Sequence, residues 1–183
     1  NLFTADLKAD CQILDCQQLY FDLGLGYTYQ QFSYHCSDTV QYSPSGVYPQ
    51  YNGIAPGRTI NYEIEYHIPY AEVAMRTNLD DFDLILSLGL APWLKVWDHD
   101  DHLRRPKFMD GDMEGSAYLA NLNARYHLSH ELDLSFGVDY KKIEAEGEQE
   151  QVGIDSGSLF SVVIEEEIAS EQLRASLGLT LKF

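Results

Sequence analysis

The feature that most constrains the fold of this chain is a strict alternation of apolar and polar residues, which recurs in seven separate stretches. In one of them Leu134, Phe136 and Val138 alternate with Ser135 and Gly137. Successive side chains of a β-strand point to opposite faces of a sheet, so a period of two predicts a strand with one apolar face. The predicted strands lie within residues 3–13, 19–29, 59–79, 82–91, 118–128, 132–141 and 173–183.

The residues opposite the apolar face decide between two all-β architectures. They are mainly Gly, Ser, Thr and Asn with isolated charges, as at Gly24, Thr28 and Asn121. Small polar side chains suit the crowded interior of a membrane barrel whose apolar face meets lipid. A soluble β-sandwich, the alternative, would carry more Lys and Glu on that face. The predicted fold class is therefore all-β, an antiparallel transmembrane β-barrel.

Aromatic residues near the strand ends agree with a barrel. Tyrosines at the membrane–water interface form the aromatic girdles of membrane proteins, and a C-terminal aromatic residue such as Phe183 is common in bacterial outer-membrane proteins. The girdle candidates are Tyr20, Tyr27, Tyr29, Tyr118, Tyr126 and Tyr140.

The connections between the predicted strands alternate in length. Residues 14–18, 80–81 and 129–131 form short connections, and residues 36–57, 101–114 and 147–167 form long ones. Outer-membrane barrels have short periplasmic turns and long extracellular loops. The acidic stretches 110–114, 144–155 and 165–167 are therefore interpreted as solvated loop or hairpin-tip residues. At Pro69 the apolar parity flips, which indicates a bulge or a strand that leaves the membrane.

The number of strands bears on whether the barrel is complete. If the last strand ends in the periplasm, seven antiparallel crossings place the start of the first segment outside the cell, whereas bacterial barrels have an even number of strands. We therefore expect residues 1–183 to form a single outer-membrane β-barrel domain that lacks an odd number of strands before Asn1. The alternative is a partner chain that supplies the strands that close the barrel.

The charge of the chain restricts its partners. There are 29 acidic and 12 basic residues, giving a formal net charge of −17. A phosphate backbone is repelled by a surface without a basic stripe, so nucleic acid is excluded as a partner. An acidic barrel mouth favours basic substrates. The partners expected are thus outer-membrane lipid and a basic peptide or protein substrate.

Three cysteines are too few for a disulfide scaffold. Cys11 and Cys16 are near enough in sequence to bond across a turn in an oxidising compartment, which would leave Cys36 unpaired. The alternative is three free thiols.

The densest group of chemically active residues follows the fourth predicted strand. Asp98, Asp100 and His102 share one parity, so an extended backbone points all three to the same side. A carboxylate such as Asp100 can orient the imidazole of His102, which then acts as a general base on water. Asp98 could receive a cationic side chain. The alternatives are a solvated acidic loop at the barrel mouth and a metal site, which lacks a third or fourth ligand.

The sequence resembles the omptins, the ten-stranded outer-membrane proteases of Gram-negative bacteria, over nearly the whole chain and at low identity. The most specific part is the segment 98–102, Asp-His-Asp-Asp-His, which is similar to the family's Asp-x-Asp-acidic-His segment. Residues 26–34, 69–84 and 178–183 are similar to the family's fifth strand, its sixth and seventh strands, and its closing strand. The resemblance implies that this chain corresponds to the C-terminal two-thirds of such a barrel, without the first three strands.

The resemblance also implies roles for individual residues. Asp100 and His102 match the catalytic Asp–His dyad, with His102 activating water, and Asp98 matches the acidic residue that binds the basic side chain before the cleaved bond. The family needs no cofactor in the chemical step but binds lipopolysaccharide through outward arginines. Tyr27 fits that lipid site, whereas Gln31 and Glu65 stand near the expected arginines. The family's second aspartate pair lies in the part that precedes Asn1.

The function expected is thus an omptin-like endopeptidase of the outer membrane that cleaves at basic residues. The alternative is a non-catalytic barrel of the same fold, serving as an adhesin, a scaffold or a porin-like envelope protein. An aspartate pair upstream of Asn1 would favour the protease. A channel is the weakest alternative, because the predicted lumen carries charges of both signs that can pair. These charges are Asp22, Arg125, Lys141, Arg174 and Lys182.

Overall fold

The chain folds into seven long β-strands joined by hairpin connections. The structure is a computed structural model that describes residues 1–41, 53–104, 107–155 and 157–182. Phe183, the C-terminal aromatic residue that favours an outer-membrane protein, lies outside the described residues. The strands are β1 (Leu2–Cys16), β2 (Leu19–Gln41), β3 (Gly53–Leu79), β4 (Phe82–His102), β5 (Lys107–His127), β6 (Leu132–Asp155) and β7 (Ser158–Leu181).

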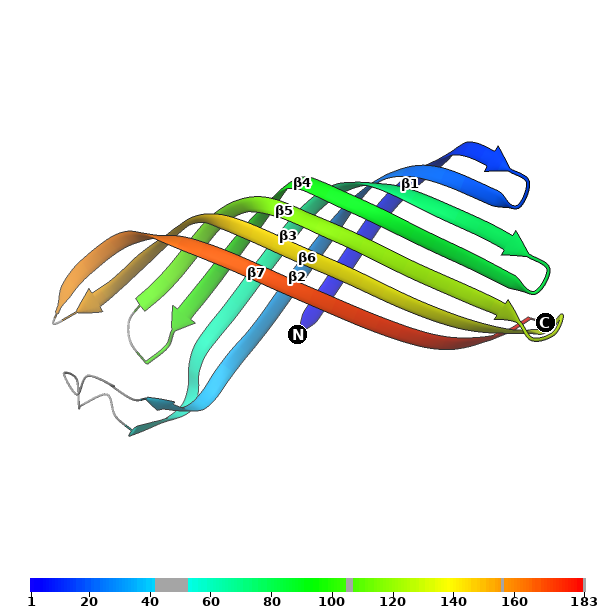
Figure 1. Cartoon of the computed structure of the whole chain (residues 1–183). Helices are drawn as coiled ribbons and strands as arrows, with labels where there is room; N and C mark the ends of the chain where they lie inside the picture. Colours follow the sequence, from blue (N-terminus) through cyan, green and yellow to red (C-terminus); the bar gives the residue numbers. More distant parts are fainter. Residues whose placement is uncertain (42–52, 105–106, 156, 183) are drawn as a thin grey trace.

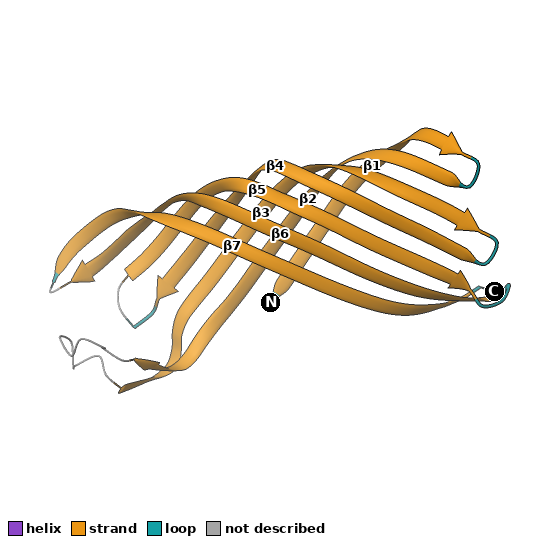
Figure 2. Cartoon of the chain, viewed as in Figure 1, coloured by secondary structure: helices purple, strands orange, loops and turns teal. Residues whose placement is uncertain are grey.

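The strands form one antiparallel sheet in sequence order, β1 to β7. Figures 1 and 2 show the β1–β2, β3–β4 and β5–β6 turns together at one end of the sheet, and the opposite hairpin ends at the other. Within the described residues the sheet is not closed, because β1 pairs only with β2 and β7 only with β6. The described part of the chain contains no helix long and apolar enough to cross a membrane.

In the half of the sheet nearer the short turns, apolar side chains point outward and polar side chains point inward. On β2, for example, Leu23 and Leu25 are exposed on the outer face, whereas Asp22 and Thr28 are buried on the inner face. This zone covers residues 19–27, 69–77, 84–93, 118–126, 132–140 and 173–181, about nine or ten residues per strand, which is the length that crosses a bilayer. The membrane-spanning part of the predicted barrel is confirmed.

Beyond this zone the two faces exchange character. On β3, Ile64, Tyr66 and Ile68 are buried on the inner face, while Glu63 and Glu65 point outward. Even-numbered residues of β3 face inward on both sides of Pro69, although the β3–β4 pairing register shifts between His67 and Ala71. The flip of apolar parity in the sequence therefore marks the level at which the outward face passes from lipid to water.

Two of the three predicted long loops are wrong, because residues 101–114 and 147–167 are mostly strand. Of the third, 36–57, residues 42–52 lie outside the described residues and the rest belong to β2 and β3. The acidic stretches 110–114, 144–155 and 165–167 lie within β5, β6 and β7, and only the second of them reaches the end of its strand. Beyond the membrane zone the outer face of the sheet is polar and the inner face is partly apolar. These parts of the strands therefore lack the apolar outer face that the prediction of membrane strands relies on.

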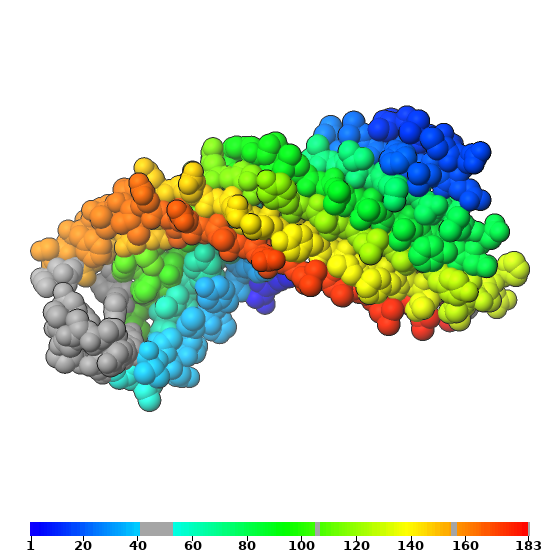
Figure 3. All heavy atoms as spheres, in the orientation of Figure 1, coloured from blue at the N-terminus to red at the C-terminus, as the bar shows by residue number. Residues whose placement is uncertain are grey.

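The sheet is strongly curled, and its apolar core lies on the concave side. Gln30 on β2 and Gln172 on β7 exchange side-chain hydrogen bonds of 2.9 and 3.2 Å, although four strands lie between β2 and β7 in the sheet order. In the space-filling view β7 crosses the front and the concave side opens below it, towards β2 and β3 (Figure 3). The core residues include Tyr70, Leu94, Val96, Met113 and Ile143.

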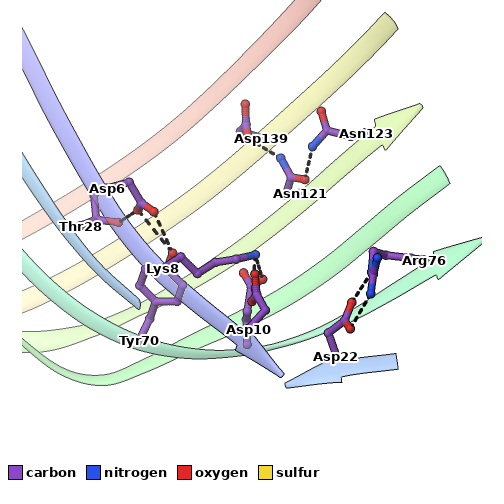
Figure 4. Close-up of polar contacts among 11 residues, drawn as sticks. Asp6, Lys8, Asp10, Asp22, Thr28, Tyr70, Arg76, Asn121, Asn123 and Asp139 are labelled. Atoms are coloured by element: carbon purple, nitrogen blue, oxygen red, sulfur yellow. Dashed lines mark hydrogen bonds and ion pairs between the residues drawn. The ribbon is translucent and has the colours of Figure 1, made fainter. Parts of the chain in front are cut away.

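Below this core, the inner face of the membrane zone is filled by paired polar groups. Arg76 donates to Asp22 at 2.8 Å, and Arg174 donates to Asp139 at 2.9 Å (Figure 4 shows the first pair). Three of the five lumen charges named from the sequence are thus ion-paired. The pairs in this zone include Asp22–Arg76, Lys8–Glu72, Asp139–Arg174 and Asp133–Lys182.

The three cysteines are free thiols in the structure. Cys11 and Cys16 lie on the same strand, β1, and the turn follows at residues 17–18 rather than between them. Five residues of extended strand span about 16 Å, whereas the Cα atoms of a disulfide lie about 5 to 7 Å apart. The expected Cys11–Cys16 bond is therefore not formed.

Candidate functional site

The last residues of β4 carry the candidate site into the concave side of the sheet. Alternation along the strand places Asp98, Asp100 and His102 on the inner face, as their shared parity predicts. The apolar residues that precede them on this face, Leu94 and Val96, are fully buried in the core. The three polar side chains thus follow directly on an apolar floor, beyond the membrane-spanning zone.

Asp100 and His102 lie within ion-pair distance of each other. His102 Nε2 is 3.4 Å from Asp100 Oδ2, and both side chains are partly buried. The other oxygen, Asp100 Oδ1, is buried and has no hydrogen-bond partner among the described residues. The spacing is longer than a strong hydrogen bond, as is common for catalytic pairs in the absence of substrate. The arrangement can orient an imidazole for proton transfer.

Asp98 is the most deeply buried acid of the group. It is 5% exposed, and neither of its carboxylate oxygens has a hydrogen-bond partner of ordinary geometry among the described residues. Burial raises the pKa of Asp98 above its usual value, and the nearby charges of Asp100 and Asp110 add to the rise. The Tyr62 hydroxyl and the Gly111 amide oppose it. A buried carboxylate without a partner is suited to receiving a cation.

Two tyrosines that the sequence analysis did not select line the same cleft. Tyr62 on β3 is the direct cross-strand partner of Asp100, and Tyr34 on β2 is the partner of Tyr62. The two rings lie 5.0 Å apart. Burial raises the pKa of the Tyr62 hydroxyl, so it stays protonated and can donate. Their positions in the alternating pattern could have indicated that they face inward, but the pattern was interpreted only as evidence for strands.

Glu166 is a further acid of the inner face that the sequence analysis placed in a hairpin tip. It lies on β7, where alternation sets it on the same side as Ile168 and Gln172. Gln149 of β6 donates to Glu166 Oε2 at 3.0 Å. Burial, followed by the charge of Asp98, raises the pKa of Glu166. The parity shared with its inward neighbours could have identified it.

His99, between the site residues in sequence, points the other way. Its Nδ1 atom lies 2.5 Å from Asp110 Oδ1, and its Nε2 atom lies 3.5 Å from Asp101 Oδ1. The hydrogen bond with Asp110 is the main reason that the pKa of His99 is raised. An open hollow of about 590 Å³ is lined by His99, Asp110 and other outward acids, and by Asp98 and Gly111. Asp100 and His102 do not line it.

The candidate lipid residue Tyr27 lies on the outer face at the upper edge of the membrane zone. Its hydroxyl is 2.5 Å from His67 Nδ1, and the His67 ring contacts Trp97 with centroids 4.5 Å apart. Above it, Gln31 donates to Glu65 at 3.3 Å. The positions at which the resemblance calls for arginines thus hold an amide and a carboxylate that bind each other.

The metal alternative gains no third ligand from the structure. In residues 1–41, 53–104, 107–155 and 157–182, no group of three or more His, Cys, Asp or Glu side chains is arranged to hold a metal ion.

Comparisons with known proteins bear on the whole chain. Residues 1–183 match the model of the Omptin family. The chain is 25% identical over 188 residues to the plasminogen activator of Yersinia pestis, covering 97% of this chain and 58% of that protein. It is also similar to the solved structure of the outer membrane protease OmpT from Escherichia coli, with a TM-score of 0.78 and 15% identity, over 100% of this chain and 64% of that one. The chain spans about three-fifths of the length of these relatives.

Proposed function

Because this chain belongs to the Omptin family, we propose that the protein is an endopeptidase of the bacterial outer membrane that cleaves peptide bonds beside basic residues. The observation that carries the proposal is the inward row of Asp98, Asp100 and His102, which stands above the apolar floor on the concave side of the sheet. The relatives' names support the reaction class, since one is a plasminogen activator and another an outer membrane protease.

In the proposed mechanism each residue of the row has one task. His102 accepts a proton from a water molecule as its oxygen attacks the carbonyl carbon of the substrate, and the imidazolium then gives that proton to the leaving amine as the C–N bond breaks. Asp100 holds the imidazole in position through the 3.4 Å contact and stabilises the imidazolium that forms. Asp98 receives the basic side chain of the substrate and so fixes the peptide relative to His102. The Tyr62 hydroxyl, beside Asp98, can donate a hydrogen bond in the cleft.

The orientation and surroundings of the barrel are part of the proposal. The strand ends that carry the site extend beyond the membrane zone and face the outside of the cell, so that they meet protein substrates, and the short turns face the periplasm. The outer apolar band contacts the lipid, with Tyr27 at its upper edge. Strands that precede Asn1, or a partner chain, close the barrel between β1 and β7.

A non-catalytic barrel of the same fold is the second candidate. The observation that favours it is a departure from the family's pattern, because Gln31 and Glu65 bind each other where the resemblance calls for the arginines of the lipid site. The two candidates differ in one measurable property, which is cleavage of a basic peptide.

Substitution of the two neighbouring histidines tests the proposal. His102→Ala should lower kcat for a fluorogenic dibasic peptide by about 10²- to 10⁴-fold, because a general base is lost. His99→Ala is the matched control, since His99 lies on the outer face, and it should keep near-normal kcat. Circular dichroism of both variants in detergent checks the fold. Equal activity of the wild-type and His102→Ala proteins would refute the assignment of the dyad.

A further inference from the structure

We propose that Glu166 is a second carboxylate of the pocket that receives the basic side chain of the substrate, acting together with Asp98. The two residues come from strands far apart in the chain, β7 and β4, and both project from the inner face of the sheet. The inference rests on the proposed function, because it concerns the substrate of that same site. It adds a specificity-determining residue on the inner face of the same sheet, with β5 and β6 between it and β4.

Asp98 and Glu166 meet above Gly111 of β5, where a side chain is missing. Gly111 pairs directly with Asp98 on β4 and with Gln149 on β6. A Cβ atom built on Gly111 would overlap Asp98 Oδ1 and would lie 2.8 Å from Glu166 Oε2. The two carboxylate oxygens therefore lie within about 5 Å of each other, so one cationic group between them can contact both.

Glu166 is held in this position by a relay of two amides. Gln151 Nε2 donates to Gln149 Oε1 at 2.8 Å, and Gln149 Nε2 donates to Glu166 Oε2 at 3.0 Å. Gln149 is itself only 7% exposed, which restricts its movement. The relay supplies one hydrogen bond to Glu166 Oε2 and no positive charge.

The pair lacks the cation that two neighbouring carboxylates require. Asp98 is 95% buried, and neither of its oxygens has a hydrogen-bond partner of ordinary geometry or a cationic partner among the described residues. None of the ion pairs in the described part of the chain involves Asp98 or Glu166; those of the same cleft join only Asp100 and His102. Close, partly desolvated charges of the same sign cost free energy.

A basic side chain is the group that relieves this cost. The guanidinium of arginine carries five donors and the ammonium of lysine three, so either can serve Asp98 and Glu166 together while its charge neutralises part of theirs. The absence of a Cβ atom at Gly111 allows the two carboxylates to approach each other closely. A neutral substrate side chain would leave both carboxylate charges uncompensated, which is the source of the proposed selectivity.

Charge removal at Glu166 tests the inference by binding, separately from catalysis. The full-length protein carrying His102→Ala is titrated with a fluorescent peptide that has one Arg, and with the same peptide carrying Gln instead. Adding Glu166→Gln should weaken binding of the Arg peptide about tenfold, which is ~1.4 kcal/mol, and leave the Gln peptide unchanged. Glu165→Gln is the matched control, because Glu165 lies on the outer face of β7, and it should bind like the parent.

A kinetic measurement with His102 intact separates a binding role from a structural one. Glu166→Gln should raise KM for the Arg peptide and leave kcat within about twofold, and Gly111→Ala should raise KM as well, because its methyl group would overlap Asp98 Oδ1 and displace the carboxylate. Unchanged binding and KM in Glu166→Gln, or equal losses in Glu165→Gln, would overturn the inference. If the wild-type protein binds the Arg peptide through Glu166 and does not cleave it, the inference stands and the proposed function fails.

Discussion

Asp98 shows at the scale of one residue how a cost in stability accompanies a proposed binding role. It is 5% exposed and has no hydrogen-bond partner of ordinary geometry among the described residues. Because burial raises its pKa, the folded state binds a proton more tightly than the unfolded state does. Stability attributable to Asp98 is therefore highest at low pH and falls as the pH rises from the unfolded pKa through the raised folded pKa.

Asp98→Asn should consequently stabilise the protein at pH 7 and impair substrate binding there. The gain in unfolding free energy, measured by denaturant titration, should disappear below about pH 3, where the carboxyl is largely protonated in both states. In the wild-type protein KM for a basic peptide should rise as the pH falls through the raised pKa, because a neutral carboxyl no longer pairs with the cation. The Asp98→Asn protein should show a high KM at every pH; a wild-type KM profile in this variant would contradict the proposed role of Asp98.

His99 makes a prediction of the opposite sign on the outer face. Its hydrogen bond with Asp110 raises its pKa, so its contribution to stability is complete below the unfolded pKa of about 6.5 and is lost as the pH rises through the folded value. The effect is small because the His99 side chain is 47% exposed and therefore screened by solvent. Asp110→Asn should flatten the fall in stability between pH 5.5 and 8.5, with no change in kcat. A fall as steep as in wild type would show that the pair is not coupled.

At the scale of the strand, the exchange of polarity between the two faces is the main organising feature. The strands run through lipid with an apolar outer face and continue into water with an acidic one, as on β6 from Phe136 and Val138 to Glu146 and Glu148. One continuous pairing register carries β6 and β7 through both environments. This continuity places Glu166 of β7 on the same inner face as Asp98 of β4.

The same exchange decides how much could be predicted from the sequence. The membrane-spanning part of each strand was found, because lipid on one side and a crowded interior on the other enforce clean alternation. The common direction of Asp98, Asp100 and His102 was also found, since parity needs no knowledge of the surroundings. The water-exposed halves of β5, β6 and β7 were missed, because outward acids resemble loop residues when the inner face is not considered. Glu166 was missed for that reason. Its approach to Asp98 beside Gly111 could not be predicted either, because it depends on how the strands pack.

Lysine substitution at two outward positions tests the boundary between the zones. Leu88 is 61% exposed near the middle of the membrane-spanning part of β4, and Leu88→Lys should destabilise the protein by about 2–4 kcal/mol. Glu146→Lys, outward on β6 beyond the boundary, should change stability by less than about 0.5 kcal/mol. Urea titration of proteins folded into lipid vesicles measures both. Equal effects of the two substitutions would place the bilayer elsewhere on the sheet.

At the scale of the whole molecule, three layers follow one another along the inside of the sheet. Ion-paired polar groups fill the membrane zone, the apolar cluster that includes Leu94, Val96 and Met113 lies above them, and the acidic cleft stands beyond it. The paired charges argue against a porin-like channel, since the inward side chains form ion pairs with one another rather than facing open water. The apolar floor separates the cleft from that interior and lowers the local dielectric around Asp98, which strengthens its attraction for a cation.

The most direct test of the proposed function is cleavage of two matched peptides by the intact protein in outer-membrane lipid. One fluorogenic peptide carries paired basic residues at its centre, and the other carries glutamines at those positions. The proposal predicts cleavage of the basic peptide between its paired residues, with kcat/KM at least 100-fold above that for the neutral peptide, since a buried carboxylate left without its cation costs about 3 kcal/mol or more. Cleavage of neither peptide, or equal cleavage of both, would contradict it.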